Sequence, residues 1–185
     1  KAKVSWVRTG FDEAVAPGEK DYDFNVQQYS ITDERKKVVD FTDSYYAGGL
    51  VVMVKDSNKA INKLTDLDGK KVSVQVGTKS VGFLTEKFPK VQRVEVEKNQ
   101  EMFSLVDIGR ADAAVTGKPA AFQYVRTRPG LRVLDEQLTT EEYGMALRKD
   151  TPELTQAVNG AIAKLKADGT YAAIVKKWFS NSAAK

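Results

Sequence analysis

The segment Ser30–Tyr46 reads SITDERKKVVDFTDSYY, and it starts with the signals of a capped helix. Thr32 can act as the N-cap residue, and two acidic residues follow it in the first turn, where a helix favours negative charge. Arg35 falls in the same turn, close in sequence to the Ser30 hydroxyl and to free backbone N–H groups. A hydroxyl, open amides and a guanidinium at one helix start suit an anion of carboxylate size. The alternative is a capped surface helix with an exposed arginine, because N-cap signals are common.

The composition excludes several classes of protein. A chain of 185 residues can form one large domain or two small ones, and its hydrophobic share of 42% is ordinary for a soluble globular protein. The net charge is +4, and basic and acidic residues are mixed throughout the chain. The absence of a concentrated basic stretch predicts no nucleic-acid partner. Cysteine and histidine are both absent, which removes disulfides, thiol catalysis, the usual zinc sites and histidine acid–base chemistry. No metal and no cofactor are therefore expected.

Strands and helices are expected to alternate along most of the chain. Short apolar or β-branched runs predict strands, and longer stretches closed by glycine or proline predict helices. The expected strands are 4–7, 23–28, 50–54, 71–75, 91–96, 111–115, 131–134 and 143–147. The expected helices are 81–87, 100–109, 119–126, 152–166 and 171–179. This alternation is typical of α/β folds with parallel sheets. Trp178, in the last helix, is expected in the core.

Five further motifs follow the opening segment in a fixed order. They are DLDGKKV at 66–72, QVGT at 75–78, GRADAAV at 109–115, YGMALRK at 143–149 and GTYAAIVKKWF at 169–179. Over nearly the whole chain, the six segments resemble bacterial periplasmic or extracytoplasmic solute-binding proteins of the polar amino-acid ABC-transporter type. The resemblance implies an α/β, two-lobed, type II periplasmic-binding clamshell that closes on its ligand about a hinge. Lobe 1 would comprise residues 1–52 and 143–185, and lobe 2 residues 53–142.

The resemblance also implies a function. The chain is expected to be an extracytoplasmic solute-binding protein of an ABC importer, in the periplasm or outside the cell, with a small carboxylate-bearing ligand and a membrane permease as partners. An enzyme is not expected, because histidine, cysteine and an obvious acid in the cleft are lacking. Glu141 and Glu142 are interpreted as surface residues, since adjacent carboxylates lack the facing geometry of a catalytic pair. The alternatives are a sensor domain and a truncated or degenerate scaffold with altered or lost amino-acid binding.

Three candidate ligand-binding residues follow from the motifs, and a fourth, an aromatic residue, from its place just upstream of the first lobe's strand. In the family that the chain resembles, the residues matching Ser30 and Arg35 bind the ligand's α-carboxylate, with the arginine as a bidentate fork. Thr78 and the amides of the helix after it would complete this carboxylate site from the other lobe. Phe11 is the aromatic residue expected to face the cleft.

Two further candidate positions depart from the family's pattern. Lys79 stands where a second hydroxyl is usual, and Gly117 occupies the place of an acid that pairs with the ligand's α-ammonium. Three interpretations remain open. The ligand can lack an α-ammonium and carry a second anionic group bound by Lys79 or Lys118, the site can have lost amino-acid binding, or another acid such as Glu101 can take the ammonium.

The part of the family that this chain resembles is shorter than a usual member of the family. Such proteins normally open with a strand, a helix and a second strand before the part that matches the start of this chain. An unpaired sheet edge and an uncovered apolar face would result in lobe 1. The expected outcomes are a domain-swapped homodimer, binding of a separate complementing N-terminal segment, or a fragment of a longer protein.

Overall fold

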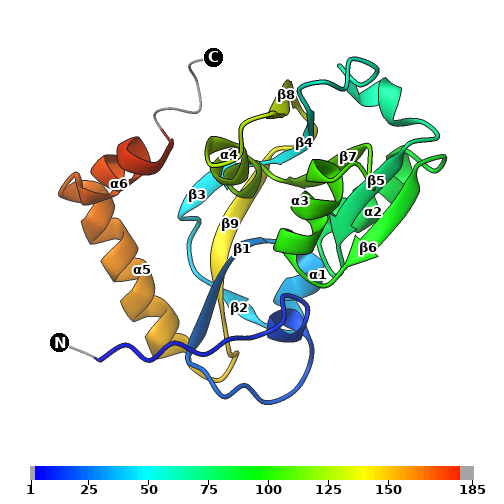
Figure 1. Cartoon of the computed structure of the whole chain (residues 1–185). Coiled ribbons are helices and arrows are strands. Elements are labelled where there is room, and N and C mark those ends of the chain that lie inside the picture. Colours follow the sequence, from blue (N-terminus) through cyan, green and yellow to red (C-terminus); the bar gives the residue numbers. More distant parts are fainter. Residues whose placement is uncertain (1–2, 180–185) are drawn as a thin grey trace.

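The computed structural model describes residues 3–179, and its strands form two sheets (Figure 1). The first sheet is four-stranded and antiparallel, and β9 lies at its centre. Its strands are β1 (Phe24–Ser30), β2 (Asp40–Phe41), β3 (Tyr46–Gly48) and β9 (Glu141–Leu147). The outer edge of β1 carries no partner strand among the described residues.

The second sheet is five-stranded and has the order β6-β5-β7-β4-β8. Its strands are β4 (Leu50–Lys55), β5 (Lys71–Gln75), β6 (Gln92–Val96), β7 (Ala113–Gly117) and β8 (Leu131–Gln137). The strand β4 is antiparallel to its neighbours β7 and β8, whereas β5 is parallel to β6 and β7. Helices connect β5, β6, β7 and β8 in turn, as the crossovers between parallel strands require. The strand β4 instead follows β3 with no helix between them. The predicted α/β fold is confirmed, with parallel pairing confined to this sheet.

Six α-helices and two 3₁₀ helices complete the described chain. They are η1 (Glu13–Val15), α1 (Asp33–Lys36), η2 (Leu64–Leu67), α2 (Lys79–Lys87), α3 (Asn99–Asp107), α4 (Lys118–Arg126), α5 (Pro152–Ala167) and α6 (Thr170–Phe179). None of the helices within residues 3–179 combines the length and apolarity that a membrane crossing needs.

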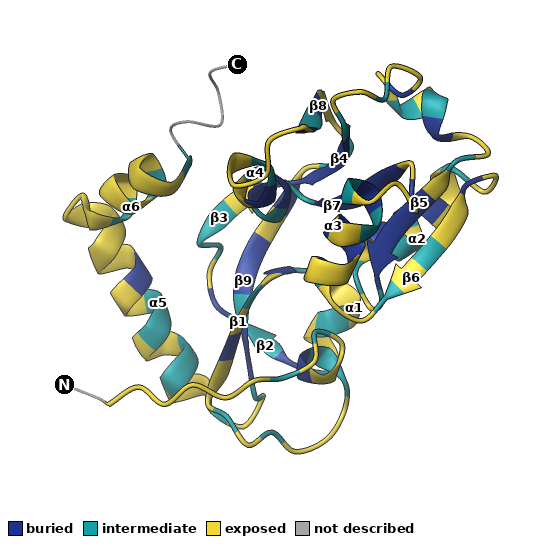
Figure 2. Ribbon diagram, viewed as in Figure 1, coloured by how far each residue is buried: buried dark blue, intermediate teal, exposed yellow. Residues whose placement is uncertain are grey.

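Both faces of the five-stranded sheet are covered. Along β4, Val52 and Val54 pack in a cluster with Leu84 of α2, whereas Met53 packs on the other face with residues of α3 and α4. This division follows from the alternation of side chains along a strand. The side chains of Val52, Met53, Val54 and Leu84 are fully buried, and Figure 2 shows β4 as a buried strand. The sheet is therefore a rigid support for the loops at its edge.

The helices α5 and α6 stand beside the first sheet and are largely exposed (Figures 1 and 2). Asn159 of α5 accepts a hydrogen bond from the Asp43 N–H at 2.8 Å in the loop before β3. The Phe179 ring of α6 lies 5.3 Å from the ring of Tyr46, the first residue of β3. Trp178 is 45% exposed, so its prediction as a core residue is wrong. The Arg126 guanidinium of α4 lies 5.5 Å from the centre of the Trp178 ring but leaves the residue half-exposed.

The N-terminal segment also differs from expectation. Residues 4–7 form no strand, and Trp6 is 87% exposed. A short apolar run becomes a strand only where another strand pairs with it, and no strand among the described residues does so here.

Two crossings join the sheets, at residues 48–50 and 137–141. Leu50 donates its N–H to the Thr139 hydroxyl at 3.0 Å and accepts one from the Leu138 N–H at 2.8 Å. A Cβ on Gly49 would lie 1.7 Å from the Thr139 carbonyl oxygen, so the backbones touch. The lobe boundaries expected at 52/53 and 142/143 fall within β4 and β9, a few residues from these crossings.

Candidate functional site

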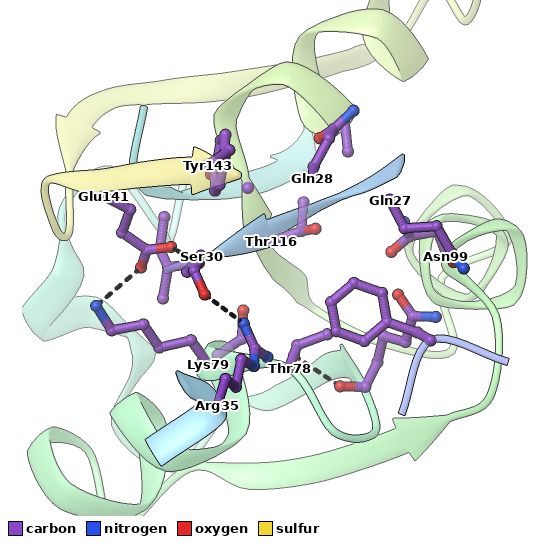
Figure 3. Close-up of a pocket in the computed structure, with 16 residues that line it drawn as sticks. Gln27, Gln28, Ser30, Arg35, Thr78, Lys79, Asn99, Thr116, Glu141 and Tyr143 are labelled. Atoms are coloured by element: carbon purple, nitrogen blue, oxygen red, sulfur yellow. Dashed lines mark hydrogen bonds and ion pairs between the residues drawn. The ribbon is translucent and has the colours of Figure 1, made fainter. Parts of the chain in front are cut away.

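A cavity of about 40 Å³ lies between the two sheets (Figure 3). This volume is far below the roughly 300–1,000 Å³ of a typical ligand pocket. All six predicted site residues line it: Phe11, Ser30, Arg35, Thr78, Lys79 and Gly117. The structure thus brings together side chains from both halves of the chain, and their roles toward a ligand stay a prediction.

Arg35 reaches the cavity from the short helix α1. The Thr32 hydroxyl accepts the Arg35 N–H at 3.2 Å, which confirms the predicted N-cap. The Arg35 guanidinium donates to the Ser30 carbonyl at 2.9 Å and to the Gly77 carbonyl at 3.1 Å. The second bond connects the first half of the molecule to the turn before α2. Three of the five guanidinium N–H groups are left without a partner among the described residues.

Aromatic rings set the position of the guanidinium. Its carbon lies 5.7 Å from the centre of the Phe11 ring and 5.5 Å from that of Tyr29, and the two rings are 4.4 Å apart. Burial lowers the pKa of Arg35, while Tyr29 and nearby carboxylates counteract this effect. Arginine remains a cation after such a shift, so the cavity wall carries a fixed positive charge.

The turn between β5 and α2 forms the opposite wall. Gly77 has φ +69°, and a Cβ there would lie 2.7 Å from the Asp12 Cβ, so both backbone shape and space require glycine. The Thr78 hydroxyl donates to the Gln75 carbonyl at 2.7 Å and makes no capping bond to α2. The helix therefore begins beside the cavity with its first N–H groups outside the intrahelical ladder, where they suit an anion.

Glu141, at the start of β9, is the feature that the sequence reasoning missed. It is 4% exposed, so its interpretation as a surface residue is wrong. Its carboxylate accepts hydrogen bonds from the hydroxyls of Ser30 and of Thr139, the latter at 2.8 Å, and forms an ion pair with Lys79 at 3.5 Å (Figure 3). Since the strand begins at Glu141 rather than at 143, alternation places this side chain on the face of Tyr143.

Gly117 and Tyr143 occupy the same corner of the cavity. A Cβ on Gly117 would lie 2.9 Å from the Tyr143 hydroxyl oxygen, so the tyrosine fills the space that a side chain at 117 would need. Burial raises the pKa of Tyr143 well above its usual value, with Glu141 as the next cause, and the hydroxyl keeps its proton. Glu101, one of the alternatives considered for an ammonium partner, is exposed on α3 and does not line the cavity.

Comparison with known proteins places this architecture in a family. The family of bacterial extracellular solute-binding proteins, family 3, matches residues 1–181. The chain belongs to this family. The resemblance found in the sequence motifs is therefore confirmed.

Two kinds of relative illustrate the likeness of this family 3 protein. The L-cystine-binding protein TcyJ of Escherichia coli K12 is 36% identical over 168 residues, which cover 90% of this chain and 63% of TcyJ. An ancestral arginine-binding protein bound to arginine has a TM-score of 0.87 at 37% identity, with 96% of this chain and 80% of that chain covered. The ancestral amino acid-binding protein AncCDT-1, a precursor of cyclohexadienyl dehydratase, has a TM-score of 0.88 at 39% identity, with 96% and 78% covered. The chain thus spans 63% of the length of the cystine-binding relative.

Proposed function

We propose that this family 3 protein is the solute-binding component of an ABC importer, that it works outside the cytoplasm, and that its ligand is an amino acid. The observation that carries the proposal is the cavity wall itself. Arg35 and the first turn of α2 face one cavity from two halves of the molecule. A guanidinium and helix N–H groups together bind a carboxylate. The names of the cystine-binding and arginine-binding relatives indicate the same class of ligand.

In this proposal the two sheets are the centres of two lobes, and the crossings at Gly49 and Thr139 are the hinge. The cavity of about 40 Å³ is small for a ligand pocket and is lined by both halves, so we expect the lobes to separate for ligand entry. The bond from Arg35 to the Gly77 carbonyl crosses between the lobes and would break on opening. A membrane permease then receives the ligand from the closed form.

Thermal unfolding with a panel of L-amino acids, including L-cystine and L-arginine, tests the proposal. A ligand that binds only the folded chain adds about 2.7 kcal/mol at a concentration 100 times its Kd. For a chain of this size, the midpoint should rise by about 5–10 °C. Small dicarboxylates without an ammonium serve as controls, and mass spectrometry should recover the amino acid unchanged, as expected of a binding protein. The absence of any shift would contradict the proposal and favour the degenerate scaffold.

Exposed apolar residues predict association of the isolated chain. Phe24 and Val26 on the outer strand β1 are 40% and 46% exposed, and Ile174 and Trp178 of α6 are similarly open. An unpaired edge with apolar side chains pairs readily with another chain. We expect a homodimer in size-exclusion chromatography with light scattering, formed by exchange of elements at this edge. A chain that remains monomeric at high protein concentration would contradict this prediction, and a separate complementing segment would convert the dimer into a heterodimer.

A further inference from the structure

One carboxylate faces the cavity together with two cations. Among the described residues that line it, Glu141 is the only acid, and Arg35 and Lys79 are the only bases. The Glu141 side chain is 1% exposed, whereas the Lys79 side chain is 42% exposed. A carboxylate buried to this degree needs a cationic or hydrogen-bonded partner at all times, because an unpaired buried charge is strongly destabilising.

The partners of Glu141 differ in how firmly they are held. Thr139 lies in the crossing at residues 137–141, and Ser30 is the last residue of β1, which pairs with β9. Their hydroxyls bond to separate carboxylate oxygens. Lys79 instead reaches across from α2 of the other half, and its ammonium is 3.5 Å from the carboxylate. A flexible, half-exposed lysine contributes at most a modest ion pair, so another ammonium can replace it.

A second polar group points to the same position. The Tyr143 hydroxyl is buried and has no hydrogen-bond partner among the described residues, although it lines the cavity next to Glu141. Buried hydroxyls are normally satisfied, so this oxygen is available to a ligand. Its place beside Gly117 also means that no acid can be accommodated at 117 without moving the tyrosine.

We propose that Glu141, with the Tyr143 hydroxyl, binds the α-ammonium of the ligand, and that the Lys79 ammonium occupies this position when the cavity is empty. The inference rests on the proposed amino-acid ligand and adds to it the partner that position 117 lacks. Arg35 and Glu141 then recognise the two charges of a zwitterion. Because Lys79 belongs to the other half of the molecule, its displacement also exchanges a contact between the halves for a contact with the ligand.

Calorimetric titration of four variants tests the inference. The probes are L-cystine, L-arginine and their deaminated counterparts, in which hydrogen replaces the α-ammonium. In the Glu141→Gln variant, affinity for the amino acid should fall on the order of 30-fold and affinity for the deaminated counterpart should change little. Glu142→Gln is the matched control, since Glu142 is the next residue and exposed. Circular dichroism establishes that each variant is folded.

Lys79→Met provides an independent reading, because it removes the competing ammonium. The preference for the amino acid over its deaminated counterpart should increase by about threefold, whereas Lys87→Met on the same helix should leave it unchanged. Equal preference in Glu141→Gln and the original chain, or a reduced preference in Lys79→Met, would overturn the inference while amino-acid binding itself persists. A chain that binds none of the amino acids would instead overturn the proposed function.

Discussion

Replacement of Arg35 by alanine should lower amino-acid affinity by at least about 30-fold. The guanidinium is the fixed cation of the cavity, with three N–H groups directed to no described residue. Truncation of a partly buried, charge-paired arginine typically costs 2–5 kcal/mol of binding free energy, because the ligand's carboxylate is then left unpaired. Calorimetric titration of an amino acid that stabilises the original chain provides the measurement.

Two variants give this prediction its controls. Arg35→Lys keeps the charge but cannot form two parallel bonds to a carboxylate, so only part of the affinity should return. Arg93→Ala removes an exposed arginine of β6 that pairs with Glu95 at 3.2 Å, and binding should be unaffected. Since Arg35 also bonds to Ser30 and Gly77, unfolding midpoints separate lost binding from lost folding. Affinity within threefold of the original chain in Arg35→Ala would contradict the carboxylate role.

Local signals predicted the parts of the site that lie next to each other in the sequence. The hydroxyl, acid and arginine pattern at 30–35 indicated a capped helix, and Thr32 caps it. The alternation of strand and helix indicated an α/β fold, and crossover helices do connect β5 through β8. The motifs then joined Arg35 to Thr78 and Gly117, which are distant in sequence and line one cavity.

Long-range packing determined what the sequence did not show. Glu141 belongs to the site only because β9 starts two residues earlier than its apolar run suggests, so that alternation directs the carboxylate inward. Conversely, Trp178 lies in a helix of the expected length, but its exposure depends on which elements cover α6. The hydrophobicity of a residue does not indicate whether another element packs over it.

Replacement of Gly49 by alanine should have the largest effect on stability, a loss of about 3 kcal/mol or more in the free energy of unfolding. The added methyl group would lie 1.7 Å from the Thr139 carbonyl oxygen and 2.7 Å from the Gln137 amide nitrogen. Hydrogen bonds hold both crossings in place and oppose their moving apart. The Gly49 carbonyl accepts the Lys118 N–H at 2.8 Å, and the adjacent Leu50 bonds to both Thr139 and Leu138. Overpacking of a closed backbone contact costs 1–3 kcal/mol and sometimes more.

Gly160→Ala is the matched control for this prediction. Gly160 lies inside α5 with no atom within 4 Å of the added methyl group, so the same substitution should stabilise the chain by about 1 kcal/mol through helix propensity. Thermal and urea unfolding of the two variants should therefore shift in opposite directions, with the midpoint of Gly49→Ala lower by about 10 °C. Ligand affinity should fall in Gly49→Ala as well, since Thr139, which the added methyl group would displace, donates a hydrogen bond to Glu141 in the cavity wall. A midpoint for Gly49→Ala equal to that of the original chain would show that the crossings do not constrain the two halves.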